Sequence, residues 1–434
     1  MSRRVPVDVA VIGGGIAGTS AAAFLAAEGL RVRLHERSEI AAGASGRNSG
    51  IVQHPFDGVL ADLYQRTLVE YRSLEAELRT SANGGSTFRL GSEPAGLLYV
   101  GHDEVVARET AGRWAQAWPA SNPDVLSGRE LGRLEPALSE DLVACRLQIG
   151  FPVAPAAATH AFAEVAKARG VEIVVGGVAR PAVSAGAIVG VDVDGDRAPA
   201  GSVVVAAGPW TPDLIEPSRT WHPIRPVWGV VAAVAVPDAP RHGLEATDID
   251  IEPPPSGGGR VGGVEPGRGG GRGDETSTRL PPSAALAMDA EVDFSLAPGL
   301  GSSALGSTFL AEEPDPSTWL DALRRVGARY VPAIASAPIL GFRHCARPVS
   351  LDGRPLVGRA GWTEGLWIIA GHGPWGISTA PGSARLLVDA MVGRVDAAIP
   401  VALDPSRFGA PGGGSRPAGA PRISARSRRS RDRT

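Results

Sequence analysis

The feature that most constrains the fold is a glycine motif near the start of the chain. Gly13, Gly15 and Gly18 have the spacing G-x-G-x-x-G. The apolar run at 8–14 is typical of a buried parallel strand, and the alanine-rich run at 17–29 is typical of a helix. In that setting the missing side chains let the backbone approach a pyrophosphate at the positive end of the helix. The motif therefore predicts a strand–helix–strand unit that binds a dinucleotide.

An acidic residue supports the same interpretation. Glu36 ends a second predicted strand at 31–37, close to the separation of about 20 residues found in dinucleotide-binding units. A carboxylate at that place can accept hydrogen bonds from both hydroxyls of an adenosine ribose, and it would repel a 2′-phosphate. These residues alone do not distinguish NAD from FAD. A glycine-rich turn without any ligand is the alternative.

The rest of the chain shows two kinds of pattern, and 434 residues are enough for two domains. Strand and helix signals recur at 158–178, 202–208 and 365–393, as in a parallel sheet covered by helices. Other stretches are richer in short strands and turns, which is typical of an antiparallel domain. We predict an α/β fold with a discontinuous parallel-sheet domain at 1–88, 150–215 and 340–403, and a mainly antiparallel β domain at 89–149 and 216–339.

Two segments have too few side chains that can bury area to offset the cost of ordering. Residues 253–283 are rich in Gly, Pro and Arg, and the tail at 404–434 is basic. We expect both segments to be disordered. An RNA-binding role is the alternative for such runs, but their arginines do not alternate with aromatic residues.

Composition argues against several classes of protein. The net charge of −3 does not favour a nucleic-acid partner. Cys145 and Cys345 are too few for a disulfide scaffold or a multi-thiolate site, so no metal is expected. The longest apolar stretches, such as 229–236, are far shorter than the roughly 20 residues that cross a bilayer. The first residues do not have the pattern of a secretory signal, so we expect a cytoplasmic protein without a membrane span.

Four further segments carry a resemblance to a known family. They are GASGRNSGIVQH at 43–54, VVVAAGPWT at 203–211, RPVSLDGRPLVGR at 347–359 and GHGPWGIS at 371–378. With the N-terminal motif, and in this order, they resemble the D-amino-acid oxidase-like (DAO) family of FAD-dependent oxidoreductases, which includes glycine oxidase, sarcosine oxidase and D-amino-acid dehydrogenase. The resemblance covers nearly the whole chain. It implies FAD as cofactor and a glutathione-reductase-like FAD/NAD(P)-binding domain roofed by the β domain.

The resemblance also implies which residues hold the cofactor. Arg47 and Asn48 can donate hydrogen bonds to phosphate or flavin oxygens, with a surface ion pair as the alternative for Arg47. Trp210 either walls the flavin or fills core, and we expect core. The expected cofactor-binding residues are Gly13, Gly15, Ile16, Ala17, Gly18, Glu36, Arg37, Ser45, Gly46, Arg47, Asn48, Ser49, Gly50, Val178, Ala207, Gly208, Gly373, Pro374, Trp375, Gly376 and Ile377.

The last predicted helix follows GHGPWGIS, and we expect it to begin near Pro381. By resemblance, its positive end would face the N1–C2=O edge of the flavin and stabilise the charge that reduction places there. A helix that only closes the domain is the alternative. His372 is expected near the cofactor, whereas His54 is expected to be structural, as a lone histidine in a loop usually is.

Arg347 lies in a stretch that is otherwise poor in charge, CARPVSLDG at 345–353. A buried guanidinium cannot release its proton, so it pairs with a carboxylate of the protein or of a ligand. In glycine oxidase-like and D-amino-acid dehydrogenase-like members, an arginine at this position resembles a clamp for the substrate carboxylate. Arg347 is therefore the predicted catalytic residue, and a buried ion pair with Asp352 is the alternative.

The chain differs from sarcosine oxidases at Gln53 and Trp375, which stand where those enzymes have an arginine and a lysine that share the substrate carboxylate. Cys345 does stand seven residues before Asp352, as in members with a covalently held flavin. A thioether bond between Cys345 and the flavin is therefore one interpretation, although a plain buried cysteine is the preferred one. Lys167, the one lysine of the chain, falls in a predicted helix and is not expected to assist oxygen.

The resemblance implies an enzyme that oxidises the C–N bond of a small amino acid or N-methyl amino acid, such as glycine, sarcosine or a D-amino acid. A hydride would pass to flavin N5, the imine product would hydrolyse, and oxygen or another acceptor would reoxidise the flavin. The alternatives are oxidation of a 2-hydroxyacid or similar C–OH substrate, and a nucleotide-binding protein without catalysis. The substrate side chain and the oligomeric state do not follow from the sequence.

Overall fold

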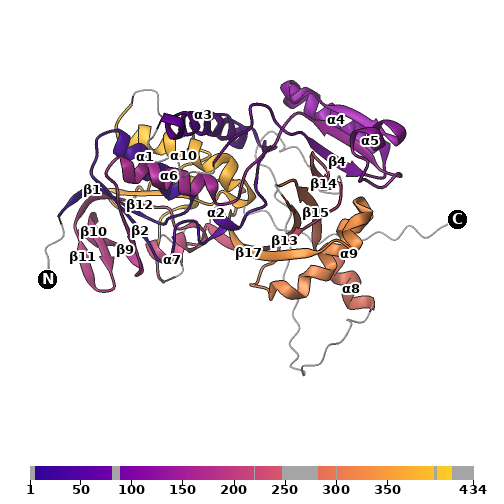
Figure 1. Ribbon diagram of the computed structural model, residues 1–434. Coiled ribbons are helices and arrows are strands. Elements are labelled where there is room, and N and C mark those ends of the chain that lie inside the picture. Colours follow the sequence, from indigo (N-terminus) through magenta and orange to yellow (C-terminus); the bar gives the residue numbers. More distant parts are fainter. Residues whose placement is uncertain are drawn as a thin grey trace.

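The computed structural model describes residues 5–80, 88–218, 220–246, 282–299, 301–394 and 398–412. These residues form two halves that lie side by side, one built on a mainly parallel sheet and the other on a mainly antiparallel sheet (Figure 1). The predicted α/β fold with these two kinds of sheet is confirmed. None of the described helices combines the length and apolar character that crossing a membrane requires.

The first sheet has six strands in the order β18-β19-β12-β1-β2-β8, and all its pairs are parallel except β18–β19. Its strands are β1 (Val7–Ile12), β2 (Val32–Glu36), β8 (Glu172–Val175), β12 (Ala200–Val205), β18 (Leu356–Arg359) and β19 (Leu366–Ala370).

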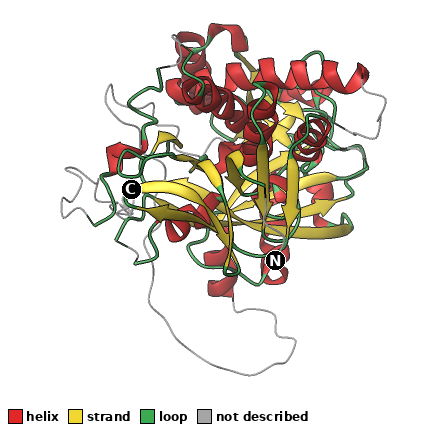
Figure 2. Cartoon of the chain, turned by 90° about the vertical axis from the view of Figure 1, so that its left-hand side faces the viewer, coloured by secondary structure: helices red, strands yellow, loops and turns green. Residues whose placement is uncertain are grey.

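Both faces of this sheet are buried, which explains why its strands are apolar without alternation. Val9 and Val11 pack against a layer of four helices, and Figure 2 shows helices gathered on one side of the strands. Ala10 and Ile12 point the other way, toward a small antiparallel sheet. The helices are α1 (Ile16–Ala27), α3 (Gly58–Thr80), α6 (Ala157–Ala168) and α10 (Gly376–Met391), and the small sheet is β9 (Ala179–Ser184), β10 (Ala187–Val193) and β11 (Asp196–Ala198).

The second sheet has eight strands in the order β17-β13-β16-β15-β14-β4-β6-β5, with β14–β4 as its one parallel pair. One face packs through Leu244, Leu296 and Leu305 against α9 (Leu320–Tyr330). The other face turns toward the first half. The strands are β4 (Leu97–Gly101), β5 (Asp124–Ser127), β6 (Val143–Leu147), β13 (Ile224–Val234), β14 (Gly243–Ala246), β15 (Val292–Ala297), β16 (Ser303–Thr308) and β17 (Ile339–Ser350).

Short elements complete the two halves. β3 (Ile51–Val52) pairs with β7 (Phe151–Pro152) where the chain passes from one half to the other. The remaining helices are α2 (Ala44–Arg47), α4 (Glu104–Ala117), α5 (Gly128–Leu134), α7 (Thr211–Ile215) and α8 (Pro282–Asp289), and the 3-10 turns are η1 (Pro119–Ser121), η2 (Gly208–Trp210), η3 (Pro316–Trp319), η4 (Pro332–Ala335), η5 (Gly373–Trp375) and η6 (Pro405–Phe408).

Two boundaries differ from those expected. Residues 340–350 were assigned to the parallel-sheet domain, but β17 pairs with β13 along most of its length and so lies in the eight-stranded sheet. The tail was expected to be disordered from residue 404, yet residues 404–412 contain η6, where Arg407 pairs with Asp352 at 2.7 Å. The rest of that tail, 413–434, and residues 253–281 of the insert lie outside the described residues.

The last helix also begins earlier than the expected start near Pro381. α10 starts at Gly376, so Pro381 lies inside it. A proline inside a helix leaves the carbonyl four residues before it without its usual N–H donor. That carbonyl belongs to Ile377, and it accepts a hydrogen bond of 2.6 Å from the hydroxyl of Tyr71 on α3. The Tyr71 hydroxyl therefore supplies the donor that Pro381 lacks.

Candidate functional site

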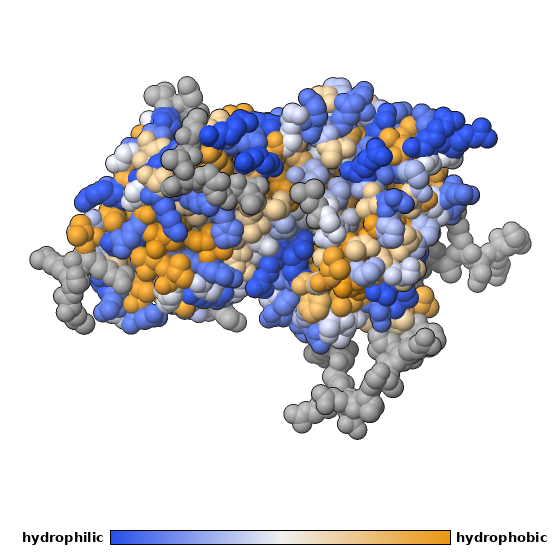
Figure 3. All heavy atoms as spheres, in the orientation of Figure 1, coloured by the Kyte–Doolittle hydropathy of each residue, from blue (hydrophilic) through white to orange (hydrophobic). Residues whose placement is uncertain are grey.

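A cavity of about 1990 Å³ lies between the two halves, lined by residues of both. On the side of the first half, its wall is made by the residues that follow the carboxyl ends of β1, β2, β12 and β19. Ligands of open parallel sheets bind at this edge. On the side of the second half, the wall is one face of the eight-stranded sheet. Seen from outside, a hydrophilic strip separates more apolar areas over the two halves (Figure 3).

The glycine motif closes the first turn as expected. Gly13 has φ +116°, in the region that favours glycine, and a Cβ there would overlap the carbonyl oxygen of Ala206. A Cβ on Gly18 would overlap the carbonyl oxygen of Gly13. Gly13, Gly15, Ile16 and Ala17 line the cavity, whereas Gly18 lies behind them. Gly18 thus brings α1 close to the sheet, so that the start of the helix faces the cavity.

Glu36 stands at the carboxyl end of β2, over the glycine turn. Its Oε2 accepts a hydrogen bond of 2.6 Å from the N–H of Gly14, and its Oε1 accepts one of 2.9 Å from Ser38. Beside it, the guanidinium of Arg37 lies 4.6 Å from the ring centre of Trp210. Trp210 lines the cavity with 40% of its surface exposed, so the expectation that it fills core is wrong.

The loop at 43–50 rests on α1 and on its own side chains. Ser45 Oγ accepts a 2.9 Å hydrogen bond from the N–H of Ile16 at the start of α1. The amide of Asn48 donates to the carbonyls of Ser45 at 2.8 Å and Pro155 at 3.2 Å. This amide is thus engaged in holding the loop, while Arg47 lines the cavity with its side chain exposed.

Most of the other expected cofactor residues also line the cavity. Those that do so are Glu36, Arg37, Ser45, Arg47, Asn48, Ser49, Val178, Ala207, Gly208, Gly373, Pro374, Trp375, Gly376 and Ile377. Gly46 and Gly50 lie behind the lining. A Cβ on Gly46 would overlap the carbonyl oxygen of Ala41, so this glycine lets the loop turn sharply.

The two histidines behave differently from each other. His372 lies at the start of the last turn, lines the cavity and contacts Ser383 Oγ through Nε2 at 3.1 Å. Burial lowers its pKa to about 3, so the imidazole is neutral. His54 donates from Nδ1 to the carbonyl of Pro55 at 2.6 Å and packs beside Trp114 and Trp118. It is not among the residues that line the cavity, so its role is structural, as expected.

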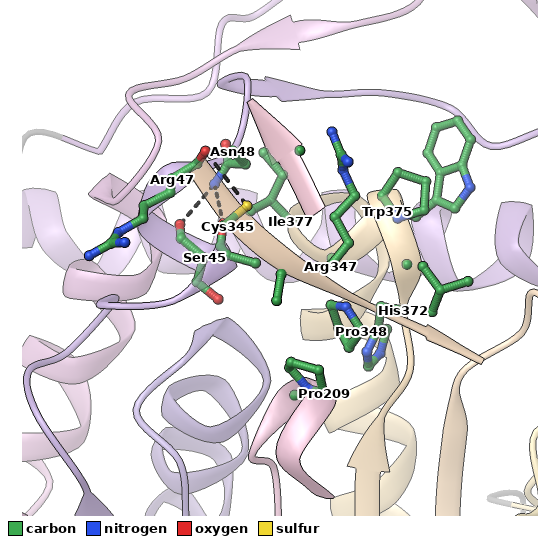
Figure 4. Close-up of a pocket in the computed structure, with 18 of the residues that line it drawn as sticks. Ser45, Arg47, Asn48, Pro209, Cys345, Arg347, Pro348, His372, Trp375 and Ile377 are labelled. Carbon is green, nitrogen blue, oxygen red and sulfur yellow. Dashed lines mark hydrogen bonds between the residues drawn. The ribbon is translucent and has the colours of Figure 1, made fainter. Parts of the chain in front are cut away.

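Arg347 is a partly buried cation of the cavity wall. Its Nη1 donates to the carbonyl of Thr308 at 2.8 Å, and its guanidinium carbon lies 4.3 Å from the ring centre of Phe309. A Cβ on Gly229 would overlap the guanidinium, so this glycine makes room for it. Burial lowers the pKa of Arg347, yet a guanidinium keeps its proton in a protein. Figure 4 shows Arg347 on the same strand as Cys345, with Trp375 and His372 on one side.

The alternative partner for Arg347 is excluded. The carboxylate of Asp352 pairs with Arg407 at 2.7 Å. Within the described ranges, Arg347 forms no ion pair with any carboxylate, although the charge of Asp293 is close enough to act on it. A cation that has lost part of its hydration without gaining a paired anion is destabilised, and Arg347 is partly buried. The site therefore favours an anionic ligand group at Arg347.

Cys345 lines the same wall, two residues before Arg347. Its Sγ points to the carbonyl of Arg47 at 3.9 Å, as drawn in Figure 4. Burial raises the pKa of the thiol, so it is protonated at neutral pH. These contacts are those of a buried thiol.

Sequence reasoning missed an acid in the cavity wall. Glu245 on β14 lines the cavity and lies against Gln53 and Tyr99. Burial raises its pKa to about 7, the neighbouring Gln53 and Tyr99 act in the opposite direction, and the charge of Asp293 raises it further. The sequence signal was a single acid in the short apolar strand GLEA, directly before the Gly/Pro/Arg-rich insert.

The sequence profile of the FAD dependent oxidoreductase family, DAO, matches residues 8–390. This range includes strands of both sheets and the walls described above. The chain belongs to this family. Its cofactor is therefore FAD, as expected from the resemblance.

Curated relatives within or near this family match over part of their own length. The tRNA 5-methylaminomethyl-2-thiouridine biosynthesis bifunctional protein MnmC of Pseudomonas putida (strain W619) is 28% identical over 435 residues, 93% of this chain and 60% of that protein. A D-amino acid dehydrogenase of Cereibacter sphaeroides (strain ATCC 17029) is 29% identical over 273 residues, 60% of this chain and 51% of that protein. The chain thus spans less than two thirds of these relatives.

Solved structures share the fold. Glycine oxidase from Bacillus cereus ATCC 14579 superimposes with a TM-score of 0.69 at 23% identity, over 89% of this chain and 95% of that chain. Iminodiacetate oxidase from Chelativorans sp. BNC1 gives 0.67 at 23% identity, over the same shares of the two chains. At such identities the likeness shows the architecture only.

The residues present fit FAD. The cavity, at about 1990 Å³, exceeds the roughly 300–1,000 Å³ of ordinary small-molecule sites and has room for a dinucleotide. The glycine turn offers a cradle that a Cβ would fill, and α1 begins there without an acidic residue in its first turn. Glu36 and Arg37 would serve the adenosine end, and residues 373–377 the flavin end.

Proposed function

We propose that this protein oxidises the C–N bond of an amine that also carries a carboxylate, such as glycine, a D-amino acid or an N-substituted amino acid. The observation that supports it best is Arg347, a partly buried cation in the cavity wall whose expected protein partner, Asp352, is engaged elsewhere. Of the cofactor-binding residues expected from the sequence, we propose that those lining the cavity contact FAD. Gly18, Gly46 and Gly50 would support them from behind the lining.

When bound, FAD supplies the hydride acceptor for such an oxidation. Arg347 would hold the substrate carboxylate, and its own orientation is fixed by Thr308 and Phe309. A carboxylate held at two points places the neighbouring carbon in one position, which is the geometry that the transfer needs. The start of α10 has no acidic residue in its first turn, so its positive end can stabilise negative charge nearby. His372 is neutral and contributes shape rather than charge.

The names of the similar proteins are consistent with this substrate class. Glycine, D-amino acids and iminodiacetate are all amines with a carboxylate, and iminodiacetate is a secondary amine. Secondary amines therefore belong among the substrates to be tried. Lys167 is exposed on α6, away from the cavity, so a cavity lysine does not assist oxygen. We propose oxygen or a second electron acceptor as the oxidant, a cytoplasmic location, and Cys345 as a free thiol.

The direct test is flavin bleaching near 450 nm without oxygen, using the purified protein with FAD. We expect bleaching by one or more members of a panel of glycine, sarcosine, D-amino acids and iminodiacetate, and none by the matched 2-hydroxyacids. Bleaching by hydroxyacids alone would instead support oxidation of a C–OH bond. Protein that binds no FAD, or that no carboxylated amine reduces, would contradict the proposal.

A further inference from the structure

Among the charged groups on the cavity wall formed by the eight-stranded sheet are Glu245 and Arg347, which have opposite sign. Glu245 on β14 stands opposite Tyr99 on β4 and Ser295 on β15. Residues directly opposite in a sheet point to the same face. Ser295 is opposite Gly306 on β16, and a Cβ on Gly306 would touch Val231 of β13. The face that holds Glu245 thus continues onto β13.

Arg347 lies on that same face. Cys345 of β17 is opposite Gly229, two residues along β13 from Val231 and so on the same side. Arg347 is two residues from Cys345, and its guanidinium bends over Gly229. Between the guanidinium and Glu245, the face offers Gly229, Gly306 and Ser295, which have small side chains or none. Val231 and the acid Asp293, two residues along β15 from Ser295, lie on the same face. The two charges therefore lie at the ends of one shallow trough.

The length of the trough follows from the sheet. Gly229 and Glu245 are on β13 and β14, which are separated by β16 and β15. Three strand spacings amount to about 14 Å. Gly229 also lies two residues along β13 from Val231, the residue in register with Glu245, which lengthens the span. With a hydrogen bond of about 3 Å at each end, a ligand that reaches both charges would therefore separate its own charged groups by at least about 8 Å. That separation is too long for the two ends of glycine, and it suits an extended chain like that of lysine.

The surroundings of Glu245 show unmet hydrogen-bonding capacity. Gln53 and Tyr99, which lie against its carboxyl, are 4% and 0% exposed. Gln53 and Tyr99 act on the Glu245 carboxyl as hydrogen-bonding neighbours, yet Gln53 Nε2 and Tyr99 Oη make no contact with the geometry of a full hydrogen bond. Buried polar atoms are nearly always paired, and Gln53 lines the cavity whereas Tyr99 lies behind it, so the Gln53 amide at the cavity wall points to a ligand. Asp293 adds negative charge nearby.

We propose that Glu245, Gln53 and Tyr99 form a second subsite, which binds an ammonium or similar cationic end of the substrate whose carboxylate is held by Arg347. The ammonium would donate to the Glu245 carboxylate, to which Gln53 Nε2 would also donate, and Tyr99 would support this carboxylate from behind the cavity wall. The substrate is then a carboxylated amine with a second cationic group, in the class of basic amino acids. The claim that such a molecule is the substrate rests on the proposed function. The claim that the subsite binds a cationic group does not.

The test compares two ligands by calorimetry on the FAD-loaded protein at pH 8, where the Glu245 carboxyl is ionised. 6-Aminohexanoate carries a carboxylate and an ammonium, and hexanoate lacks the ammonium. We expect 6-aminohexanoate to bind about 10- to 100-fold more tightly. Glu245→Gln should reduce this preference to less than about threefold while hexanoate affinity is kept. Gln53→Met should reduce it less, and serves if Glu245→Gln does not fold.

The matched control is Glu313→Gln, which removes the same charge from another acid of the cavity lining. Its preference should equal that of the unmodified protein. The proposal is overturned if the unmodified protein has no preference, if Glu245→Gln keeps it, or if Glu313→Gln loses it equally. The two proposals fail separately. Preferred binding of 6-aminohexanoate with no amine that bleaches the flavin would refute the function alone, and bleaching by glycine-sized amines without the preference would refute the subsite alone.

Discussion

The two walls of the cavity are built in different ways. The wall near the glycine motif consists mainly of backbone, held in place by Gly13 in the turn after β1 and by Gly18 inside α1, where an added Cβ would overlap backbone. The wall formed by the eight-stranded sheet consists of side chains, such as Arg347 on β17 and Glu245 on β14. Backbone atoms cannot move aside for an added side-chain atom without shifting a strand or helix. Side chains can move aside, so the wall built from them keeps its function until a charged group is removed. The two walls should therefore fail differently when they are altered.

The largest effect is expected at the backbone wall. Gly18→Ala places a Cβ against the carbonyl oxygen of Gly13, which cannot move without shifting β1 or α1. We expect the free energy of unfolding to fall by about 3 kcal/mol and FAD to be lost. Denaturant unfolding and the absorbance of bound flavin measure both. Gly112→Ala on α4 is the control, because nothing lies within 4 Å of its added Cβ. If Gly18→Ala were as stable as that control and kept its FAD, the backbone wall would be more adaptable than described.

The corresponding change on the side-chain wall should spare the cofactor. Gly229→Ala places a Cβ against the guanidinium of Arg347, which is the far end of a flexible side chain. The guanidinium would move and lose its bond to Thr308, so we expect hexanoate to bind about tenfold more weakly while FAD is retained. Calorimetry measures the affinity, with Gly341→Ala on β17 as the control. Loss of FAD along with the affinity would remove the distinction between the two walls.

The smallest effect concerns the acid of the side-chain wall. The pKa of Glu245 rises from 4.5 to about 7, because burial disfavours its charged form. The folded protein then binds this proton more tightly than the unfolded chain, so the free energy of unfolding falls as pH rises from about 4.5 to about 7. Tyr99 and Asp293 are the titratable groups acting on it, and they remain in both proteins.

Glutamine cannot ionise at this position. The difference in free energy of unfolding between Glu245→Gln and the unmodified protein should therefore favour the variant more at pH 8 than at pH 5, by about 1 to 2 kcal/mol. This figure is reduced because solvent has partial access to the side chain. Urea unfolding at the two pH values measures the difference. An equal effect at both values would mean that the carboxyl keeps an ordinary pKa.

The contrast between the walls also explains how far the sequence could be interpreted. The glycine motif, Glu36 and the loops at the strand ends were predictable, because their residue types follow from local backbone geometry. The place of Arg347 in the cavity wall was predictable from its motif, while its role stays a prediction. Glu245 was not, since its position beside Gln53 and Tyr99 depends on the pairing of β14 with β4, and these strands are far apart in the chain.

Two errors have the same origin. Trp210 was expected in the core because its aromatic ring is apolar, but the surface of Arg37 provides the contact that keeps it at the cavity edge. Pro381 was expected to begin a helix, because proline fits a first turn. The hydroxyl of Tyr71 on another helix makes a different position tolerable. In both cases a partner distant in sequence decided the outcome.

The account depends most on Arg347 as the fixed cation for a carboxylate beside the flavin, and one kinetic comparison tests this directly. Arg347→Leu should keep its FAD, while kcat/KM for the carboxylated amine that bleaches the flavin falls by about two to four orders of magnitude. Arg225→Leu, at another arginine of the cavity lining, should change it little. An unchanged kcat/KM in Arg347→Leu with bound flavin would contradict the account.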